Sequence, residues 1–334
     1  MTDRITPAPF FSDVDDGPEG GHAVWVQTAD DTRIRVGAWP CANAQGTVLL
    51  FPGRTEYVEK YGRAARDLAA RGFATLAVDW RGQGIADRMT DNPLQGHVGR
   101  FSDYQLDVAG VLDAAKAMNL PKPYHLIGHS MGGCIGLRSL YEGLPVESAV
   151  FTGPMWGFSL PVVSRPFVWL LAGVAKLVGL GKLYVPGVVR DAYVLITPFQ
   201  GNKLTKDKDM YEYMIRQTRA HMPVALAGPT LGWLFEGLME TRALSRKQAP
   251  DLPCLTFVGS DERIVDVDAI LGRMADWDNG RLEMIEGGDH EVIMDTPEVR
   301  KRLFDAIAAH FHASAGTSAP NIAPENGVLT SINR

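Results

Sequence analysis

The sequence predicts an α/β protein with a mostly parallel central sheet flanked by helices and a helical insertion. Two observations predict this fold class. Short, wholly apolar runs alternate with stretches of helical periodicity, which is typical of parallel strands buried on both faces. After Gly153-Pro154 this alternation stops, and apolar and aromatic stretches punctuated by proline continue to about Arg246. We interpret the second segment as helices inserted between two strands.

The expected strands are short apolar or β-branched runs bounded by turn-forming residues. The first two are joined at Asp30-Asp31 and predict an antiparallel pair. The later strands are separated by helical stretches, so they should run parallel to one another. The strands are expected at His22–Thr28, Thr32–Trp39, Thr47–Phe51, Phe73–Val78, Tyr124–Gly128, Ser148–Thr152, Pro253–Gly259 and Arg281–Ile285.

Helices are expected where apolar residues recur every three or four positions. Val58 to Arg71 has such a spacing, and Gly72 after it suits the left-handed conformation of a helix C-cap. Asp103 to Met118 has a similar spacing, and a last helix runs from Pro297 to about His312.

These elements divide the chain into four parts. Residues 1–21 are an N-terminal extension, residues 22–154 and 247–312 are the α/β core, and residues 155–246 are a helical cap. Residues 313–334 are rich in Ala, Ser, Thr, Asn, Pro and Gly, and we expect a flexible C-terminal tail there.

Composition narrows the function classes. Of the 334 residues, 46% are hydrophobic and 22% are charged, as in an ordinary globular protein, and the net charge of -6 argues against a nucleic-acid partner. Cys41, Cys134 and Cys254 are scattered and fit a reducing compartment, with no spacing that predicts a metal site. The sequence shows neither a signal-peptide pattern at its start nor an apolar run of membrane-spanning length. We therefore expect a cytoplasmic protein.

The most informative motif is Gly128-His129-Ser130-Met131-Gly132, which has the pattern G-x-S-x-G. It follows an apolar run and precedes a helix-like segment, the order that a nucleophile elbow requires. Such a turn holds the serine in a strained backbone conformation, so small residues must flank it. It also points the free amides of the helix N-terminus at a developing negative charge. Ser130 is therefore the expected nucleophile.

A serine nucleophile needs a base, and the base is usually oriented by an acid. Proteins with this elbow place the acid after a late strand and the histidine in a late loop. Of the eight histidines, only His290 follows a late strand in a glycine-rich turn. For the acid we favour Asp261, which follows the strand that ends at Gly259. The other aspartates considered for this role are Asp251, Asp266, Asp268 and Asp289.

Two backbone amides should form the oxyanion hole. One belongs to Met131, the residue after the nucleophile. The other should come from the loop Phe51-Pro52-Gly53-Arg54, where Gly53 permits a turn that presents the Arg54 amide toward the serine. In this interpretation Arg54 acts through its backbone and not through its charge.

Four motifs in order carry a resemblance to a known family. They are Phe51-Pro52-Gly53-Arg54-Thr55-Glu56-Tyr57, Asp79-Trp80-Arg81-Gly82-Gln83-Gly84, Gly96-His97-Val98-Gly99-Arg100-Phe101-Ser102-Asp103-Tyr104 and Gly128-His129-Ser130-Met131-Gly132-Gly133. Over residues 22–312 the chain resembles the α/β-hydrolases of the lysophospholipase L2 and monoacylglycerol lipase group, also described as the serine aminopeptidase S33 type. The resemblance implies an α/β-hydrolase fold and the roles already given to Ser130, Asp261, His290, Arg54 and Met131.

Two positions depart from the monoacylglycerol lipase pattern. Pro52-Gly53 stands where that group usually has His-Gly, and Ile85-Ala86 stands where a serine commonly follows R-G-x-G. Asp79 and Arg81 are expected to pair with each other and hold the loop after their strand.

The expected activity is hydrolysis of carboxylic esters of acyl lipids, with no metal or organic cofactor. Alternatives are a peptidase, amidase or lactonase on the same scaffold, or a non-catalytic binding protein. An aminopeptidase would need carboxylates in the cap to hold an ammonium group, and Glu212, Glu236 and Glu240 are available. The apolar cap favours an acyl chain. It either packs as core over the site or makes peripheral contact with a membrane.

Overall fold

The computed structural model describes residues 4–160, 163 and 165–314. The C-terminal tail expected from 313 lies outside this part of the chain, except for residues 313 and 314, which end the last helix. The strands are β1 (Ile5–Ala8), β2 (His22–Gln27), β3 (Arg33–Trp39), β4 (Thr47–Phe51), β5 (Ala74–Asp79), β6 (Tyr124–His129), β7 (Ala149–Thr152), β8 (Cys254–Gly259) and β9 (Gly280–Ile285).

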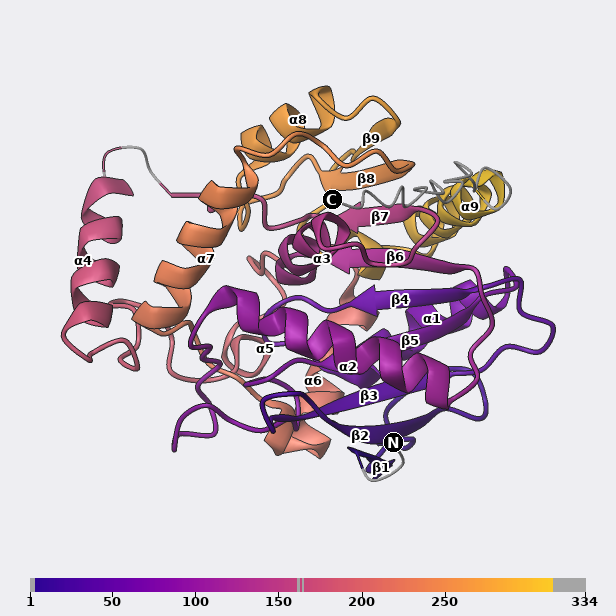
Figure 1. The fold of residues 1–334 in the computed structure, drawn as a ribbon, viewed down its shortest axis with the longest axis horizontal. Helices are drawn as coiled ribbons and strands as arrows, with labels where there is room; N and C mark the ends of the chain where they lie inside the picture. The colour runs from indigo at the N-terminus through magenta and orange to yellow at the C-terminus, as the bar shows by residue number, and fades with distance from the viewer. Residues whose placement is uncertain (1–3, 161–162, 164, 315–334) are drawn as a thin grey trace, which may run out of the picture.

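These strands form one sheet in the order β1-β2-β3-β5-β4-β6-β7-β8-β9 (Figure 1). β1, β2 and β3 pair antiparallel, and β3 is also antiparallel to β5. Every pairing from β5 to β9 is parallel. The fold is therefore the mostly parallel α/β sheet that the alternating pattern predicts. The carboxyl ends of β6, β8 and β9 lie at the same edge of the sheet, and a parallel sheet places its site there.

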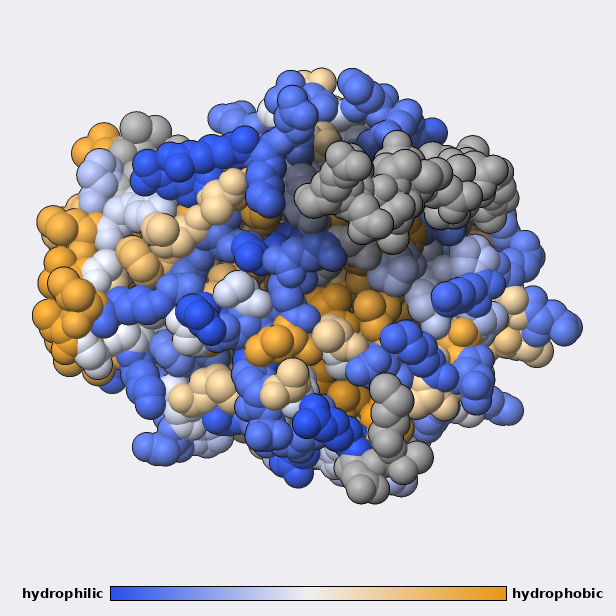
Figure 2. Space-filling view, in the orientation of Figure 1, coloured by the Kyte–Doolittle hydropathy of each residue, from blue (hydrophilic) through white to orange (hydrophobic). Residues whose placement is uncertain are grey.

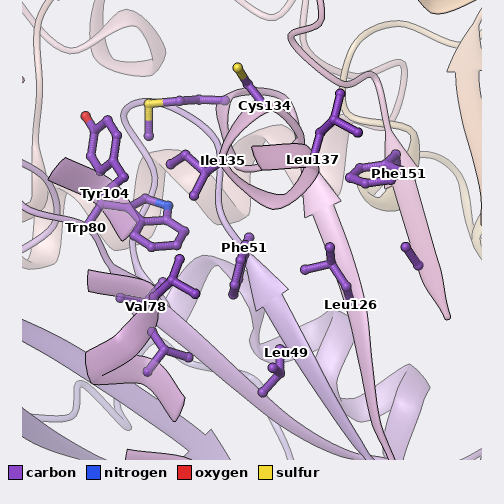
Figure 3. Close-up of a cluster of buried hydrophobic side chains, with 14 of the residues drawn as sticks. Leu49, Phe51, Val78, Trp80, Tyr104, Leu126, Cys134, Ile135, Leu137 and Phe151 are labelled. Carbon is purple, nitrogen blue, oxygen red and sulfur yellow. The ribbon is translucent and has the colours of Figure 1, made fainter. Parts of the chain in front are cut away.

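Helices cover both faces of the sheet. Helices α2 (Tyr104–Ala117), α3 (Met131–Tyr141) and α8 (Val267–Ala275) contribute to one buried cluster, which includes Phe51, Trp80 and Leu126 from the strand side (Figure 3). Helices α1 (Gly62–Ala69) and α9 (Pro297–Ser314) contribute to a second cluster on the opposite face. The strands between these clusters are almost wholly inaccessible to water, which explains why they are apolar without alternation.

The regular elements described between β7 and β8 are helices joined by long loops. This segment contains α4 (Arg165–Leu177), α5 (Tyr193–Ile196), α6 (Lys208–Ala220), a 3-10 turn at Met222–Val224, and α7 (Leu231–Leu244). Helix α4 packs along α7 at one end of the molecule (Figure 1). Helix α6 instead buries Met210, Tyr211, Tyr213 and Met214 in the same cluster as α1 and α9. Part of the predicted cap is therefore packed against the core.

Three details differ from the sequence-based expectations. Residues 5–8, within the predicted extension, form β1 and pair with β2. The helix expected over 58–71 is a 3-10 turn, η2 (Val58–Tyr61), followed by α1, and Gly72 does adopt a left-handed φ of 85°. The expected Asp79–Arg81 pair is wrong, because a different cation, Arg35, pairs with the Asp79 carboxylate. Arg35 Nε lies 2.8 Å from Asp79, and Arg81 pairs with Asp30 and Asp107.

Candidate active site

Ser130 lies in a sharp turn between β6 and α3. Its φ and ψ are 49° and -119°, a conformation that a non-glycine residue adopts only when its surroundings hold it there. Two hydrogen bonds do so, since the Ser130 amide donates to the Thr152 carbonyl at 3.1 Å and its own carbonyl accepts from the Met155 amide at 2.8 Å. The expected elbow is present, and the Ser130 side chain borders a cavity.

The glycines of the motif are required by close approach of other backbone segments. A Cβ on Gly132 would lie 1.9 Å from the Phe51 carbonyl oxygen, and one on Gly133 would lie 2.6 Å from Pro154 Cβ. The first contact brings the end of β4 against the first turn of α3. It therefore places the loop with Arg54 beside the helix N-terminus that begins at Met131.

His290 lies in the loop after β9, and its partner is a glutamate. Nδ1 of His290 is 2.6 Å from Oε2 of Glu262, and both side chains are almost completely buried. Because an ionised carboxylate only accepts hydrogen bonds, Nδ1 of His290 carries a proton and donates to Glu262, and Nε2 is the ring nitrogen that Glu262 does not engage. Oε1 of the same carboxylate accepts from the amides of Ile264 (2.6 Å) and Val265 (3.2 Å). These bonds fix the carboxylate, and the carboxylate fixes the imidazole.

The structure corrects the choice of Asp261 for this position. Its amide donates to the Gly288 carbonyl at 2.9 Å, and its side chain points outward, where it is 51% exposed and 3.1 Å from Lys206 Nζ. The side chain of Glu262, one position later, faces inward and is fully buried. The spacing from β8 located the correct loop, but which of two adjacent carboxylates faces the histidine depends on the turn. The chain order of acid and then histidine admits a glutamate as well as an aspartate.

The surroundings keep Glu262 ionised. Burial by itself would raise the pKa of Glu262, but the hydrogen bond from His290 and the amides of Ile264 and Val265 outweigh it and lower that pKa. Gly153, with a φ of 47°, packs against the pair, and a Cβ there would lie 3.2 Å from both His290 Nδ1 and Glu262 Oε2. The pair is thus enclosed on this side by backbone.

Side chains hold the loop that carries the Arg54 amide. The amide of Thr55 donates to Gln83 Oε1 at 2.6 Å, and the Gly53 amide donates to the Glu56 carboxylate. Thr55 has a left-handed φ of 68°. The amides on both sides of Arg54 are therefore already hydrogen-bonded, one within the loop and one to Gln83. Gln83 comes from the R-G-x-G motif, and its role in supporting this loop was not expected from the sequence.

A buried charged cluster lies behind the loop and the histidine. Lys60 Nζ is 2.6 Å from Glu56 Oε1 and also pairs with Glu291, while His129 Nε2 is 3.2 Å from Glu291 Oε2. Burial alone would lower the pKa of His129, but the carboxylates of Glu291 and Glu56 raise it. Glu56, His129 and Glu291 offer three ligand atoms within 4.8 Å of one another, as a metal ion would need. The Lys60 ammonium supplies one positive charge to the two carboxylates, and His129, whose pKa they raise, supplies the second when it is protonated.

Ser130 and His290 line one cavity of about 540 Å³. Most of its lining is apolar and comes from the insertion, including Val188, Val194, Met214, Val224, Leu226 and Trp233. The lining carboxylates, Glu56 and Glu291, belong to the Lys60 cluster. The carboxylates expected for an aminopeptidase do not border this cavity, and each pairs with a cation: Glu212 with Lys208, Glu236 with Lys176 and Glu240 with Arg138.

Comparison with known proteins shows the family. The model of the family described as "Serine aminopeptidase, S33" matches residues 42–297, so the chain belongs to this family. Lysophospholipase L2 of Escherichia coli K12 is 28% identical over 303 residues, which is 85% of each chain. Human monoglyceride lipase is 26% identical over 300 residues, covering 84% of this chain and 88% of the human one.

Solved structures show the same fold. A soluble variant of the Saccharomyces cerevisiae monoglyceride lipase, in complex with a substrate analog, has a TM-score of 0.67 at 20% identity and covers 85% of this chain and 92% of its own. A thermostable carboxyl esterase from Bacillus coagulans has a TM-score of 0.68 at 14% identity, and the match covers 88% of this chain and 98% of the esterase. The chain is an α/β-hydrolase, as its motifs imply.

Proposed function

We propose that this member of the S33 family is a serine hydrolase that cleaves carboxylic esters of monoacyl lipids. The observation that carries the proposal is the cavity itself. Ser130 in a strained elbow and His290 oriented by a buried carboxylate both line one mostly apolar cavity. The relatives named lysophospholipase and monoglyceride lipase support an ester hydrolase that acts on lipids.

The proposed reaction has two steps that share one base. Nε2 of His290 takes the proton of Ser130, whose oxygen attacks the acyl carbonyl, and the imidazolium then protonates the leaving alcohol. Water, deprotonated by the same nitrogen, releases the fatty acid from the acyl-enzyme. Glu262 is proposed to stabilise the imidazolium and hold its tautomer. The amides of Met131 and Arg54 are proposed to bind the oxyanion, where loss of one donor slows turnover about 10²–10³-fold.

The lining favours an acyl chain over a peptide. A substrate ammonium would need an uncommitted carboxylate, and the two carboxylates that border the cavity face Lys60 and His129. The apolar side chains from the insertion match an alkyl chain instead. This argument disfavours an aminopeptidase and leaves amides or lactones as outcomes of the substrate test.

Activity and nucleophile are tested together with a fluorophosphonate probe and an ester panel. Wild type should be labelled, and Ser130→Ala should be neither labelled nor active. Hydrolysis should extend to medium and long p-nitrophenyl esters. Activity on the acetate alone would refute the acyl pocket, and an unlabelled wild type would favour a binding protein.

We also propose that the insertion contacts membranes through α4. Phe167, Leu170 and Leu177 of this helix are 66%, 65% and 85% exposed, and the surface over α4 is a continuous apolar patch (Figure 2). Exposed apolar side chains gathered on one element mark interaction surfaces. The net charge of -6 gives no attraction to anionic lipid, so contact would rest on apolar burial. No helix in the described ranges meets the length and hydropathy needed to cross a membrane.

Sedimentation with phosphatidylcholine vesicles tests this contact. Leu170→Asp should reduce the bound fraction, whereas Leu271→Asp on α8, also exposed, should not. Equal binding of both variants and wild type would refute a role for α4.

A further inference from the structure

Arg54 carries a buried cation that has no carboxylate partner among the described residues. Three other buried cations are paired with carboxylates: Arg35 with Glu59 and Asp79, Arg81 with Asp30 and Asp107, and Lys60 with Glu56 and Glu291. Arg273 is buried without an ion pair in the ranges that the structure describes, but two of its nitrogens donate to the carbonyls of Leu244 and Lys247. Burying a charge without a counter-ion is costly, so such a group is retained where it serves a ligand or a mechanism. Arg54 lines the cavity that holds Ser130.

One edge of this guanidinium is free. Nη1 donates to the Ala227 carbonyl at 2.9 Å, which anchors the group to the insertion. Nε and Nη2 are buried and have no hydrogen-bond partner in the part of the chain that the structure describes. Nε and Nη2 lie on the same edge of the guanidinium. Through this edge an arginine can donate two parallel hydrogen bonds to two oxygens of one anion.

The surroundings keep the group cationic but poorly solvated. Burial lowers the pKa of Arg54 to about 10, which leaves it protonated at neutral pH. Its Cζ lies 5.1 Å from the centroid of the Trp233 ring, and a Cβ on Gly96 would lie 3.2 Å from Nη2. A low-polarity setting of this kind strengthens any bond to an anion that enters it.

We propose that the free edge of Arg54 binds the phosphodiester oxygens of a monoacyl phospholipid while Ser130 attacks its ester. The inference rests on the proposed ester-hydrolase function and names its head-group site. The backbone amide of Arg54 is proposed to face the oxyanion, and the side chain spans about as many bonds as the glycerol that separates ester from phosphate. A phosphodiester has one negative charge and two free oxygens, which match the two nitrogens.

Binding requires the edge to turn toward the cavity. That rotation breaks the hydrogen bond to the neutral carbonyl of Ala227 and forms two bonds to a charged group, which are the stronger kind. The same residue then contacts two features of the substrate, the ester through its amide and the phosphate through its side chain. A monoacylglycerol offers only the first.

The test compares two esters with the same acyl chain, lauroyl lysophosphatidylcholine and monolauroylglycerol. Arg54→Met keeps the amide and the length of the side chain but removes the charge. The ratio of the two kcat/KM values, phospholipid over glyceride, should fall about 10- to 100-fold, mainly through KM. Arg54→Lys keeps a positive charge but lacks two parallel N–H donors, so its ratio should lie between those of wild type and Arg54→Met.

Arg88→Met is the matched control. Arg88 likewise has no carboxylate partner in the described chain, but it donates to the carbonyls of Gly84, Ala86, Pro93 and Pro223 and does not border the cavity. This variant should leave the ratio unchanged. Thermal unfolding adds a second readout, because removing an unpaired buried charge should leave the Arg54→Met midpoint equal or higher. A lower midpoint with an unchanged ratio would make Arg54 structural and overturn the proposal.

Calorimetry on Ser130→Ala separates the inference from the proposed function. Glycerophosphocholine should bind, and the added Arg54→Met change should abolish that binding. A wild type that cleaves neither ester would refute the function, and this titration would still decide the anion site. Binding of inorganic phosphate without glycerophosphocholine would show a free-anion site and overturn the head-group assignment.

Discussion

Replacing Glu262 by glutamine should remove most of the activity while preserving the fold. The amide oxygen of glutamine can still accept from the Ile264 and Val265 amides, as Oε1 of Glu262 does at 2.6 and 3.2 Å. The amide nitrogen then faces His290 Nδ1, now 2.6 Å from a carboxylate oxygen. Because that nitrogen donates, Nδ1 must accept, and the proton moves to Nε2. His290 would then present Nε2 to the cavity as a hydrogen-bond donor and not as a base.

The expected loss in kcat is about 10³–10⁴-fold, equivalent to about 4–5.5 kcal/mol of transition-state stabilisation. Asp261→Asn is the matched control, since it changes the adjacent carboxylate in the same way. That side chain is half exposed and pairs with Lys206, so its loss should change the stability by at most about 1 kcal/mol and leave activity within a few-fold.

The assay is single-turnover labelling with a fluorophosphonate together with steady-state hydrolysis of a soluble p-nitrophenyl ester. Thermal unfolding of both variants verifies that they fold. Equal losses in the two variants, or an Asp261→Asn loss larger than that of Glu262→Gln, would refute the assignment of Glu262 as the orienting acid.

Three further outcomes are expected. Gly153→Ala should lower kcat, and should lower the free energy of unfolding by about 1–2 kcal/mol, because its Cβ crowds His290 and Glu262. Gly143 also has a left-handed φ but, apart from its chain neighbours, no described residue would lie within 4 Å of a Cβ there, so Gly143→Ala should change unfolding alone. Equal activity of the two variants would contradict this. Lys60→Met should lower the unfolding free energy by about 3–5 kcal/mol in urea titrations, because the buried carboxylates of Glu56 and Glu291 lose their cation. A change smaller than about 1 kcal/mol would show that these ion pairs contribute little to stability. The pKa of Glu262 is lowered from 4.5, so its contribution to stability is present above that pH and is lost as the pH falls through the folded-state value; urea unfolding toward about pH 3 should therefore weaken wild type more than Glu262→Gln, and parallel curves would refute the linkage.

The order of local patterns along the chain was enough to predict the fold class and two residues, Ser130 and His290, that the structure places on one cavity. Ser130 is predictable because the elbow is a local structure: a strand, a turn with glycines and a helix follow one another in sequence. His290 is predictable because a parallel sheet brings the ends of late strands to the same edge as β6. The nine-stranded order agrees with that reasoning for the sheet. β1 was not predicted because its sequence, Ile-Thr-Pro-Ala, is only four residues long and contains a proline.

The tertiary structure decided which neighbouring side chains face the site. Asp261 and Glu262 are adjacent carboxylates, and only the path of the turn after β8 sends one to Lys206 and the other to His290. Likewise, the sequence assigns Arg54 a role through its amide. That its side chain lies buried beside Trp233, with no carboxylate partner among the residues the structure describes, depends on the tertiary packing of the insertion. Local sequence determines backbone turns over a few residues. The direction and pairing of a side chain depend on segments that lie far apart in the chain.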